Sequence, residues 1–136
     1  MLLASAICSC SEKQPATTEP MITKTEIQVE NGKLTPEIMH RLGKVGDPQL
    51  SPNYGKILYG VSYTSIEQNK GNRELFLMNA DGTENVKLTN TPKSESNARW
   101  INDSQIIYMR GGKLYTATIE GSTLKNEKEV TGAEGM

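Results

Sequence analysis

The sequence predicts an all-β fold, preceded by one short helix and a disordered N-terminal tether. From Asp47 onward, apolar residues alternate with polar ones, which is typical of strands that bury one face. Turn residues such as Asp81-Gly82 separate these stretches. The stretches also recur in the same order in two successive units, and this recurrence indicates a repeated structure.

Composition excludes several classes of function for this chain of 136 residues. Lys and Arg total 15 and Asp and Glu total 16, so the basic excess of a nucleic-acid-binding protein is absent. There is a single histidine, which excludes a metal site with several histidine ligands. No apolar run approaches the ~20 residues of a membrane-spanning helix. We expect neither a cofactor nor a metal site.

The first ten residues differ from the rest of the chain. They read MLLASAICSC, which is apolar and small, and the chain turns polar at Ser11. The core of a signal peptide is a run of ~7–15 apolar residues that ends in small residues. Residues 1–10 are therefore expected to be a truncated lipoprotein signal peptide, since no basic stretch precedes them.

Both cysteines lie in this segment, so a disulfide framework is excluded. Ile7-Cys8-Ser9-Cys10 resembles a bacterial lipoprotein box, in which a branched apolar residue stands three places before the modified cysteine and a small residue stands just before it. Cys10 meets both conditions, whereas Cys8 follows the bulky Ile7. The resemblance predicts lipid attachment at Cys10, where several acyl chains would anchor the protein stably. An ordinary signal peptide with incidental cysteines is the alternative.

Residues 11–33 are expected to form a flexible tether between this anchor and a folded body. Thr, Glu, Lys, Gln and Pro predominate and no aromatic residue occurs. Such a segment buries too little surface to offset its ordering entropy. Within the tether, residues 25–30 alternate between apolar and polar, which predicts one short strand.

A short helix is predicted next. Thr35 supplies a capping hydroxyl, Pro36 suits the first helical position, and Glu37 lies near the positive end of the helix dipole. Gly43 is a residue that commonly ends a helix at its C-terminus. At about two turns the helix is too short to be stable alone, so it must pack on another element. The residues expected to form its apolar stripe are Ile38, Met39 and Leu42. His40 lies on this helix and is expected to be a surface residue.

The strands and turns follow in order. Expected strands cover residues 56–63, 73–79 and 86–89 in the first unit, and residues 97–100, 105–109, 113–119 and 129–131 in the second. The expected turns are residues 80–83, 111–112 and 120–122.

The two units can be aligned. Ile57-Leu58-Tyr59 matches Ile106-Ile107-Tyr108, and Leu75-Phe76 matches Leu114-Tyr115. The difference in residue number between matching positions is not constant along the two units, because the first unit carries an insertion at about residues 64–72. About four strands in about 40–50 residues is typical of a propeller blade. Residues 34–136 are therefore predicted to form about two four-stranded blades of an incomplete β-propeller, blade one at about 47–92 and blade two at about 97–131.

Two blades cannot close a propeller, which takes roughly 4–8 of them. One apolar face should then lack a neighbour. The residues expected to pack against the first blade on one side and to need a third blade on the other are Ile106, Tyr108, Leu114 and Tyr115. A small two-sheet sandwich is the alternative fold.

The repeat also contains recognisable sequence motifs. Residues 50–59 resemble the "SPDGK-I-x-Y" start of a TolB-like propeller blade, and residues 75–83 with 87–89 resemble its "L-(Y/F)-(V/L)-M-N-A-D-G … L-T" end. The first unit departs from this pattern at Asn53 and Tyr54, where Asp-Gly is usual. The second unit lacks the Met-Asn-Ala-Asp stretch.

A narrower resemblance lies just upstream. Residues 34–52, LTPEIMHRLGKVGDPQLSP, resemble the start of the mature domain of prolyl oligopeptidase-family serine peptidases of the bacterial dipeptidyl-peptidase and acylaminoacyl-peptidase types. In that family a propeller caps a C-terminal α/β-hydrolase domain and screens which peptides reach it. The resemblance implies a non-catalytic N-terminal propeller fragment of an exported serine peptidase.

No catalytic residue can be carried over from that family. Its serine lies in a Gly-x-Ser-x-Gly elbow, which is absent here, and no histidine follows Tyr54. Some members hold the amino terminus of the substrate with propeller acids. Glu67 and Glu74 are the acids to which this role would fall, but neither lies in a matching motif, so solvated charges are expected.

The alternative function is a TolB-like envelope propeller that binds proteins or peptides and has no enzyme domain. An independent small enzyme is not expected, because no nucleophile–base pairing or metal cluster is visible. The expected partners are further blades and the hydrolase domain, peptide substrates of the full-length form, and the membrane through a lipid anchor. The expected location is the bacterial cell envelope, on its periplasmic or surface side.

Overall fold

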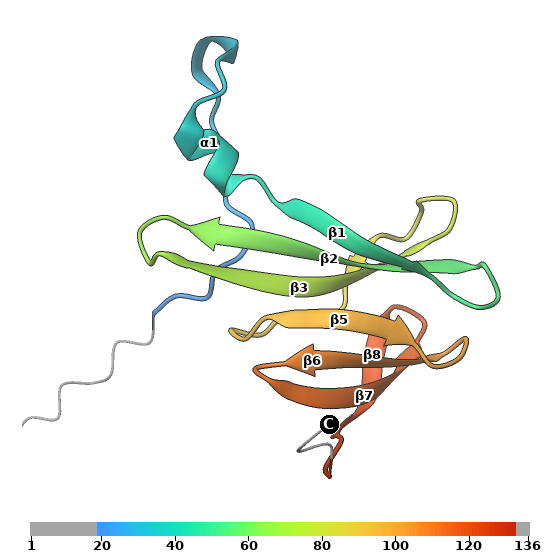
Figure 1. The fold of residues 1–136 in the computed structure, drawn as a ribbon. Helices are drawn as coiled ribbons and strands as arrows, with labels where there is room; N and C mark the ends of the chain where they lie inside the picture. Colours follow the sequence, from blue (N-terminus) through green and yellow to red (C-terminus); the bar gives the residue numbers. More distant parts are fainter. Residues whose placement is uncertain (1–18, 133–136) are drawn as a thin grey trace, which may run out of the picture.

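The computed structural model describes residues 19–132. Two four-stranded antiparallel sheets stack one above the other, and one short α-helix stands at the far side of the first sheet (Figure 1). This arrangement confirms the all-β prediction. Sheet A contains β1 (Lys44–Leu50), β2 (Lys56–Ser65), β3 (Lys70–Asn79) and β4 (Val86–Lys87), in that order across the sheet. Sheet B contains β5 (Glu95–Trp100), β6 (Gln105–Arg110), β7 (Lys113–Glu120) and β8 (Thr123–Glu129), also in chain order.

Helix α1 (Pro36–Arg41) forms where the capping signals predict it. The Oγ1 of Thr35 accepts a hydrogen bond from the backbone N–H of Ile38 at 3.3 Å. The expected packing is only partly present, because Ile38 is half-buried while Met39 and Leu42 are 54% and 45% exposed.

The strand predicted at residues 25–30 is wrong. This segment is extended without strand pairing and leads into a short 3-10 helix, η1 (Glu30–Gly32). Alternation alone does not make a strand, because a strand also needs a neighbouring edge to supply its hydrogen bonds. Asn31 and Gly32 have positive φ angles of 54° and 66°, which turn the chain away toward α1.

The first strand of each sheet carries a β-bulge. In β1 the bulge lies between Gly46 and Gln49, and in β5 it lies between Ser96 and Arg99. The residues after Gly46 and Ser96 have φ angles of 53° and 52°, so the two strands bend in the same way. The expected strands did not include residues 44–50. They form the edge strand β1, where Pro48 is tolerated because it lies at the bulge.

The insertion of the first unit lengthens the β2–β3 hairpin. Ten residue pairs join the two strands, from Lys56↔Asn79 to Ser65↔Lys70. The matching β6–β7 hairpin has six pairs and turns at Gly111-Gly112. The insertion therefore extends the hairpin beyond the end of sheet B, and its tip meets the segment that precedes α1.

The closing strand predicted at residues 129–131 is wrong in its position. Strand β8 begins at Thr123, because Gly121, with a φ of 60°, allows the chain to reverse within two residues. Just after β8, the N–H of Val130 donates to the carbonyl of Leu114 at 2.8 Å. The N–H of Leu88 donates to the carbonyl of Leu75 at the same distance. The ends of the two units are thus equivalent, as their alignment predicted.

Strand register confirms the rest of that alignment. Leu50 pairs with Ile57 in sheet A, and Trp100 pairs with Ile106 in sheet B. The next strand continues the correspondence, with Tyr59↔Phe76 in sheet A and Tyr108↔Tyr115 in sheet B. Ile57 is therefore equivalent to Ile106, Leu58 to Ile107, and Tyr59 to Tyr108.

The main core lies between the sheets. The inner face of sheet A presents Leu58, Leu75 and Leu77, and the inner face of sheet B presents Ile106, Tyr108, Ala117 and Ile119. Tyr115 packs against this core as expected, whereas Leu114 is half-buried on the opposite face. We call the opposite faces the outer face of sheet A, with Ile57, Tyr59, Val61, Tyr63, Phe76 and Met78, and the outer face of sheet B, with Ile107, Met109, Leu114 and Thr116.

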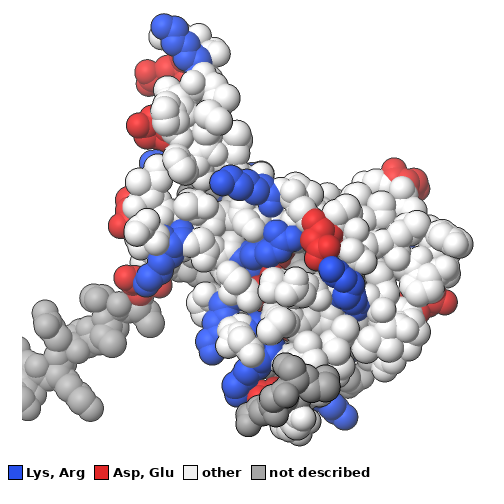
Figure 2. Space-filling view, viewed as in Figure 1, with Lys and Arg blue, Asp and Glu red and all other residues white. Residues whose placement is uncertain are grey.

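Charges of both signs are mixed on the surface. Figure 2 shows lysine and arginine side chains beside acidic ones across the face seen in Figure 1, in keeping with the net charge of −1. Within residues 19–132, no helix has the length and apolar character needed to cross a membrane.

Candidate functional site

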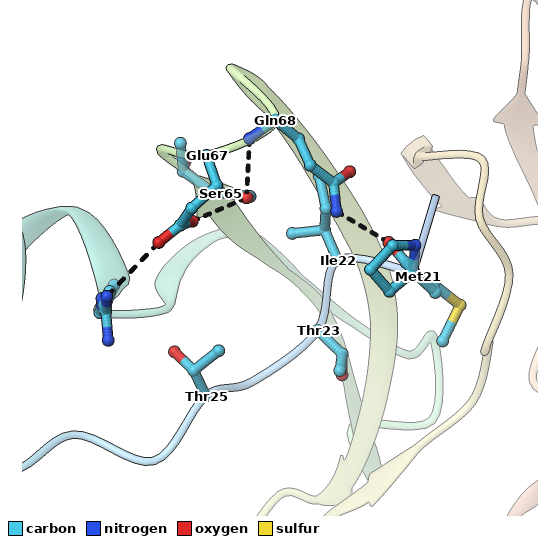
Figure 3. Close-up of a pocket in the computed structure, with 10 residues that line it drawn as sticks. Met21, Ile22, Thr23, Thr25, Ser65, Glu67 and Gln68 are labelled. Carbon is cyan, nitrogen blue, oxygen red and sulfur yellow. Dashed lines mark hydrogen bonds and ion pairs between the residues drawn. The ribbon is translucent and has the colours of Figure 1, made fainter. Parts of the chain in front are cut away.

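A pocket of about 390 Å³ lies at the tip of the lengthened β2–β3 hairpin (Figure 3). One wall comes from the hairpin, including Thr64, Ser65, Glu67 and Gln68, and the other comes from residues 20–25. Both walls depend on features outside the repeat, namely the insertion and the segment before α1. Arg41 of α1 also lines the pocket.

The N-terminal wall is held by hydrogen bonds to its backbone. Gln68 Nε2 donates to the carbonyl of Pro20 at 3.0 Å, and Asn72 Nδ2 donates to the carbonyl of Ile22 at 3.1 Å. The Ile22 side chain packs on the outer face of sheet A. The segment is therefore fixed by main-chain contacts and one apolar anchor, although its composition predicted a flexible tether.

Glu67 supplies a negative charge at the rim of this pocket. Its carboxylate accepts a hydrogen bond from Ser65 Oγ at 3.1 Å and lies 3.5 Å from the guanidinium of Arg41. Its own backbone N–H and the Ser65 hydroxyl lower the pKa of Glu67 below its ordinary value. The side chain is 71% exposed, so an ionised carboxylate beside several hydroxyls faces solvent. Such a site can accept hydrogen bonds from a cationic or amide group.

Glu74 occupies a different environment, because it is fully buried with Glu95 under the loop that joins the sheets. Its Oε1 accepts hydrogen bonds from Asn72 Nδ2 and the Thr91 N–H, both at 3.1 Å, and Lys87 Nζ lies 3.6 Å away. Of the two acids suggested by the sequence, only Glu67 is thus open to a ligand. Glu74 belongs to an internal network.

Thr89 joins the two buried acids. Its Oγ1 lies 2.7 Å from Glu74 Oε2 and 3.1 Å from Glu95 Oε2, and it accepts the N–H of Leu75 at 2.9 Å. One hydroxyl proton can satisfy only one of the carboxylates. A proton on Glu74 Oε2 satisfies both, because Glu74 then donates to Thr89 and Thr89 donates to Glu95. Burial, with the nearby charge of Glu95, raises the pKa of Glu74 and favours this proton.

Glu74→Gln should therefore change how stability depends on pH. A raised pKa means that the folded state holds the proton more tightly than the unfolded state, so this group's contribution is fully present below its ordinary value of 4.5 and is lost as pH rises. Lys87 and Glu95 face the same group, together with Tyr63, whose pKa burial raises. We expect Glu74→Gln to gain stability relative to the parent as pH rises, in urea unfolding from pH 4 to pH 8. A difference that stays constant with pH would contradict the shared proton.

The other residues singled out in the sequence are not brought together. Cys10 lies outside the described residues. His40 is exposed on α1 and shares a surface recess with Ser65, but the Ser65 hydroxyl donates to Glu67. The hydroxyl of Ser65 is thus bonded to the Glu67 carboxylate, at 3.1 Å. Within residues 19–132, no group of three or more His, Cys, Asp and Glu side chains is placed to hold a metal ion.

Sequence reasoning missed the contacts that cross between the sheets. Arg99 Nη1 lies 2.8 Å from Asp47 Oδ2, and this contact lowers the pKa of Asp47. Trp100 Nε1 donates to the carbonyl of Gln49 at 3.0 Å. The only signal in the sequence was the repeat itself, which predicts that the first strands of both units lie side by side.

Comparison with known proteins gives two similarities. Over 97 residues the chain is 33% identical to dipeptidyl-peptidase 5 of Porphyromonas endodontalis, a match that covers 71% of this chain and 13% of that protein. Over 74 residues it is 36% identical to dipeptidyl-peptidase 5 of Porphyromonas gingivalis, covering 54% of this chain and 11% of that protein. No family model matches the chain. These similarities support a relationship to the dipeptidyl-peptidase family, with the chain spanning only a small part of its relatives' length.

Proposed function

We propose that the chain is a non-catalytic propeller portion of an exported serine peptidase of the dipeptidyl-peptidase type. In the full-length protein the propeller would gate the access of peptides to the catalytic domain. The observation that carries this proposal is the way in which the two equivalent sheets stack. The stacking supports the propeller, and the similarities support the peptidase.

The sheets contact each other through opposite faces. Leu58 and Ile107 are equivalent by register, yet Leu58 lies in the core while Ile107 lies on the outer face of sheet B. Ile57 and Ile106 are equivalent too, but here Ile57 lies on the outer face of sheet A and Ile106 lies in the core. The contact is therefore head to tail, or heterologous. Blades around an axis stack in this way, whereas a sandwich of two repeats related by a two-fold axis would bury the same face of each.

The names of the matched relatives favour a peptidase over a binding module without an enzyme domain. The chain itself would line the substrate route and not carry out the reaction, since its sequence contains no Gly-x-Ser-x-Gly elbow and no histidine after Tyr54. The open pocket at the hairpin tip, with the ionised Glu67 at its rim, would form part of the route that peptides follow.

A chimera tests this proposal. The stretch of Porphyromonas gingivalis dipeptidyl-peptidase 5 that matches this chain would be replaced by the corresponding residues of the chain. A control chimera would carry the matching stretch of the Porphyromonas endodontalis protein. Release of dipeptides from reporter substrates is expected for both chimeras, and no release is expected for the chain alone.

The outcomes separate folding from function. Both chimeras should show the same thermal unfolding transition as the parent, because the exchanged sheets stack in the same way. A control chimera that is active beside a chimera that is folded but inactive would contradict the proposal. Activity of the chain alone that survives repurification would contradict its non-catalytic role.

We further propose that the full-length protein is anchored in the cell envelope through Cys10. The support is the Ile7-Cys8-Ser9-Cys10 sequence followed by a polar segment. With an upstream signal sequence added, the parent should partition into membranes, and Cys10→Ala should be released. Mass spectrometry of the mature protein should show added acyl mass on Cys10. Equal membrane partition of Cys10→Ala and the parent would contradict the anchor, and Cys8→Ala serves as the matched control.

A further inference from the structure

We infer that the cleft at the tip of the β2–β3 hairpin is a binding site for an extended peptide, and that residues 19–22 of the chain itself occupy this site in the structure. We call these four residues the strap. The inference deepens the proposed function and rests on it for its consequence, because a peptide that displaces the strap would open the route along which peptides are gated. It needs no surface beyond the area that the strap already covers.

Side-chain amides of the hairpin hold the backbone of the strap. Gln68 Nε2 donates to the carbonyl of Pro20 at 3.0 Å (Figure 3), and Asn72 Nδ2 donates to the carbonyl of Ile22 at 3.1 Å. These two carbonyls are two residues apart, and the strap is extended without strand pairing. Hydrogen bonds to the main chain of an extended segment provide affinity for peptides of many sequences. A separate peptide can therefore make the same bonds.

Two side-chain contacts of the strap define the peptide that the site prefers. Glu19 Oε2 lies 2.6 Å from Lys70 Nζ. Ile22 packs against the apolar cluster on the outer face of sheet A. Contacts of this kind provide the specificity that main-chain bonds lack. The expected ligand is therefore an extended peptide with an acidic residue three positions before an aliphatic one.

The strap leaves one part of the site unused. Among residues 19–132, Asn72 Oδ1 finds no hydrogen-bond partner, although Asn72 is only 3% exposed and lines a cavity of about 150 Å³ beside the strap. A side-chain amide carries a donor and an acceptor, so it can pair with both the C=O and the N–H of one peptide residue. With Ile22 it bonds only the C=O. A peptide that lies slightly deeper would bring its N–H to Asn72 Oδ1 and complete the pair.

The strap is held weakly enough to be displaced. The Glu19 and Lys70 side chains are each 60% exposed, and an ion pair between exposed side chains contributes little stability. The two hydrogens of Asn72 Nδ2 face three acceptors, because Glu74 Oε1 lies at 3.1 Å and the carbonyl of Thr91 at 2.9 Å in addition to the strap. Cavities of about 390 and 150 Å³ also adjoin the strap, so it fills only part of the cleft.

A charge-swap experiment tests the site in the full chain. Lys70→Glu places like charges at the contact with Glu19, so it should loosen the strap and favour a blocked peptide of sequence KPMITK. In fluorescence anisotropy, we expect labelled KPMITK to bind this variant several-fold more tightly than it binds the parent. The peptide EPMITK, which has the sequence of residues 19–24, should bind the variant more weakly than KPMITK does. Lys33→Glu, at another exposed lysine, is the matched control and should behave as the parent does.

A second variant tests the apolar contact. Ile22→Asp removes the anchor of the strap, so EPMITK should bind this variant several-fold more tightly than it binds the parent, whereas Ile22→Val should not differ from the parent. Methylation of the backbone nitrogen of the peptide isoleucine removes the N–H that Asn72 Oδ1 would accept, and should weaken binding several-fold. Methylation at the final lysine of the peptide is the control and should leave binding unchanged.

Thermal unfolding transitions of the variants are compared with that of the parent, and Lys70→Glu should match it because Lys70 is exposed. Absence of KPMITK binding to folded Lys70→Glu would overturn the inference, as would an unchanged preference between the two peptides. Equal binding of EPMITK to the parent and to folded Ile22→Asp would also overturn it. These results are separate from the activity of the chimera, which tests the proposed function.

Discussion

Arg110→Met is expected to unfold a large share of the molecules, because among residues 19–132 only Arg110 supplies a cation in direct contact with Glu95. Arg110 Nε donates to Glu95 Oε1 at 2.6 Å, and the Glu95 side chain is fully buried. Its guanidinium also binds Glu127 and lies over the rings of Tyr108 and Tyr115, 5.5 and 5.2 Å from their centroids. Breaking a buried pair from one side costs roughly 3–5 kcal/mol, because the other charge stays buried.

Urea unfolding of the parent and the variant measures this loss. Methionine keeps most of the apolar stem of the arginine, so the loss reports the charge and its hydrogen bonds. Lys113→Met is the matched control, since Lys113 pairs with Glu129 at the exposed end of the same hairpin, and its stability should be unchanged. Adding Glu95→Gln to Arg110→Met should recover part of the loss. No recovery would show that the charge of Glu95 is not the cause.

Leu58→Ala is expected to destabilise the fold by roughly 2–5 kcal/mol, the usual cost of truncating a buried leucine. Leu58 is fully buried between the sheets. The matched control is Ile107→Ala at the equivalent position of sheet B, which lies on an outer face and should cost far less.

The comparison also tests the direction of stacking. A sandwich that buried equivalent faces would make the two substitutions cost about the same. Head-to-tail stacking makes them unequal, with the larger loss at Leu58. Equal losses would therefore contradict the arrangement from which the proposed function is argued.

These two predictions address different parts of one interface. The Leu58 side chain lies in its apolar centre, whereas Arg110 and Glu95 lie at the end where the inter-sheet loop crosses. At that end Thr89 links Glu95 to Glu74, so the loop is held by hydrogen bonds between buried polar groups. Because such groups are costly when left unpaired, the network helps to set how the second sheet sits on the first.

The sequence by itself determined much of the local structure. The capping residues before Ile38 placed the helix, and the Asp81-Gly82 turn and the alternation around it placed the hairpins. The alignment of the two units in the sequence is enough to establish the equivalence of Leu58 with Ile107. These features follow from residues close together in the chain, where periodicity and turn chemistry carry the information.

Other features were decided only by tertiary structure. The strand at residues 44–50 exists because sheet A offers an edge that tolerates a bulge and a proline, while residues 25–30 found no such edge. The sequence could not separate the roles of Glu67 and Glu74, which lie seven positions apart on one hairpin. One faces an open pocket and the other is buried beneath a loop from the next unit. Whether a carboxylate is buried or shares a proton depends on which distant segments of the chain come into contact, and no local sequence pattern predicts that contact.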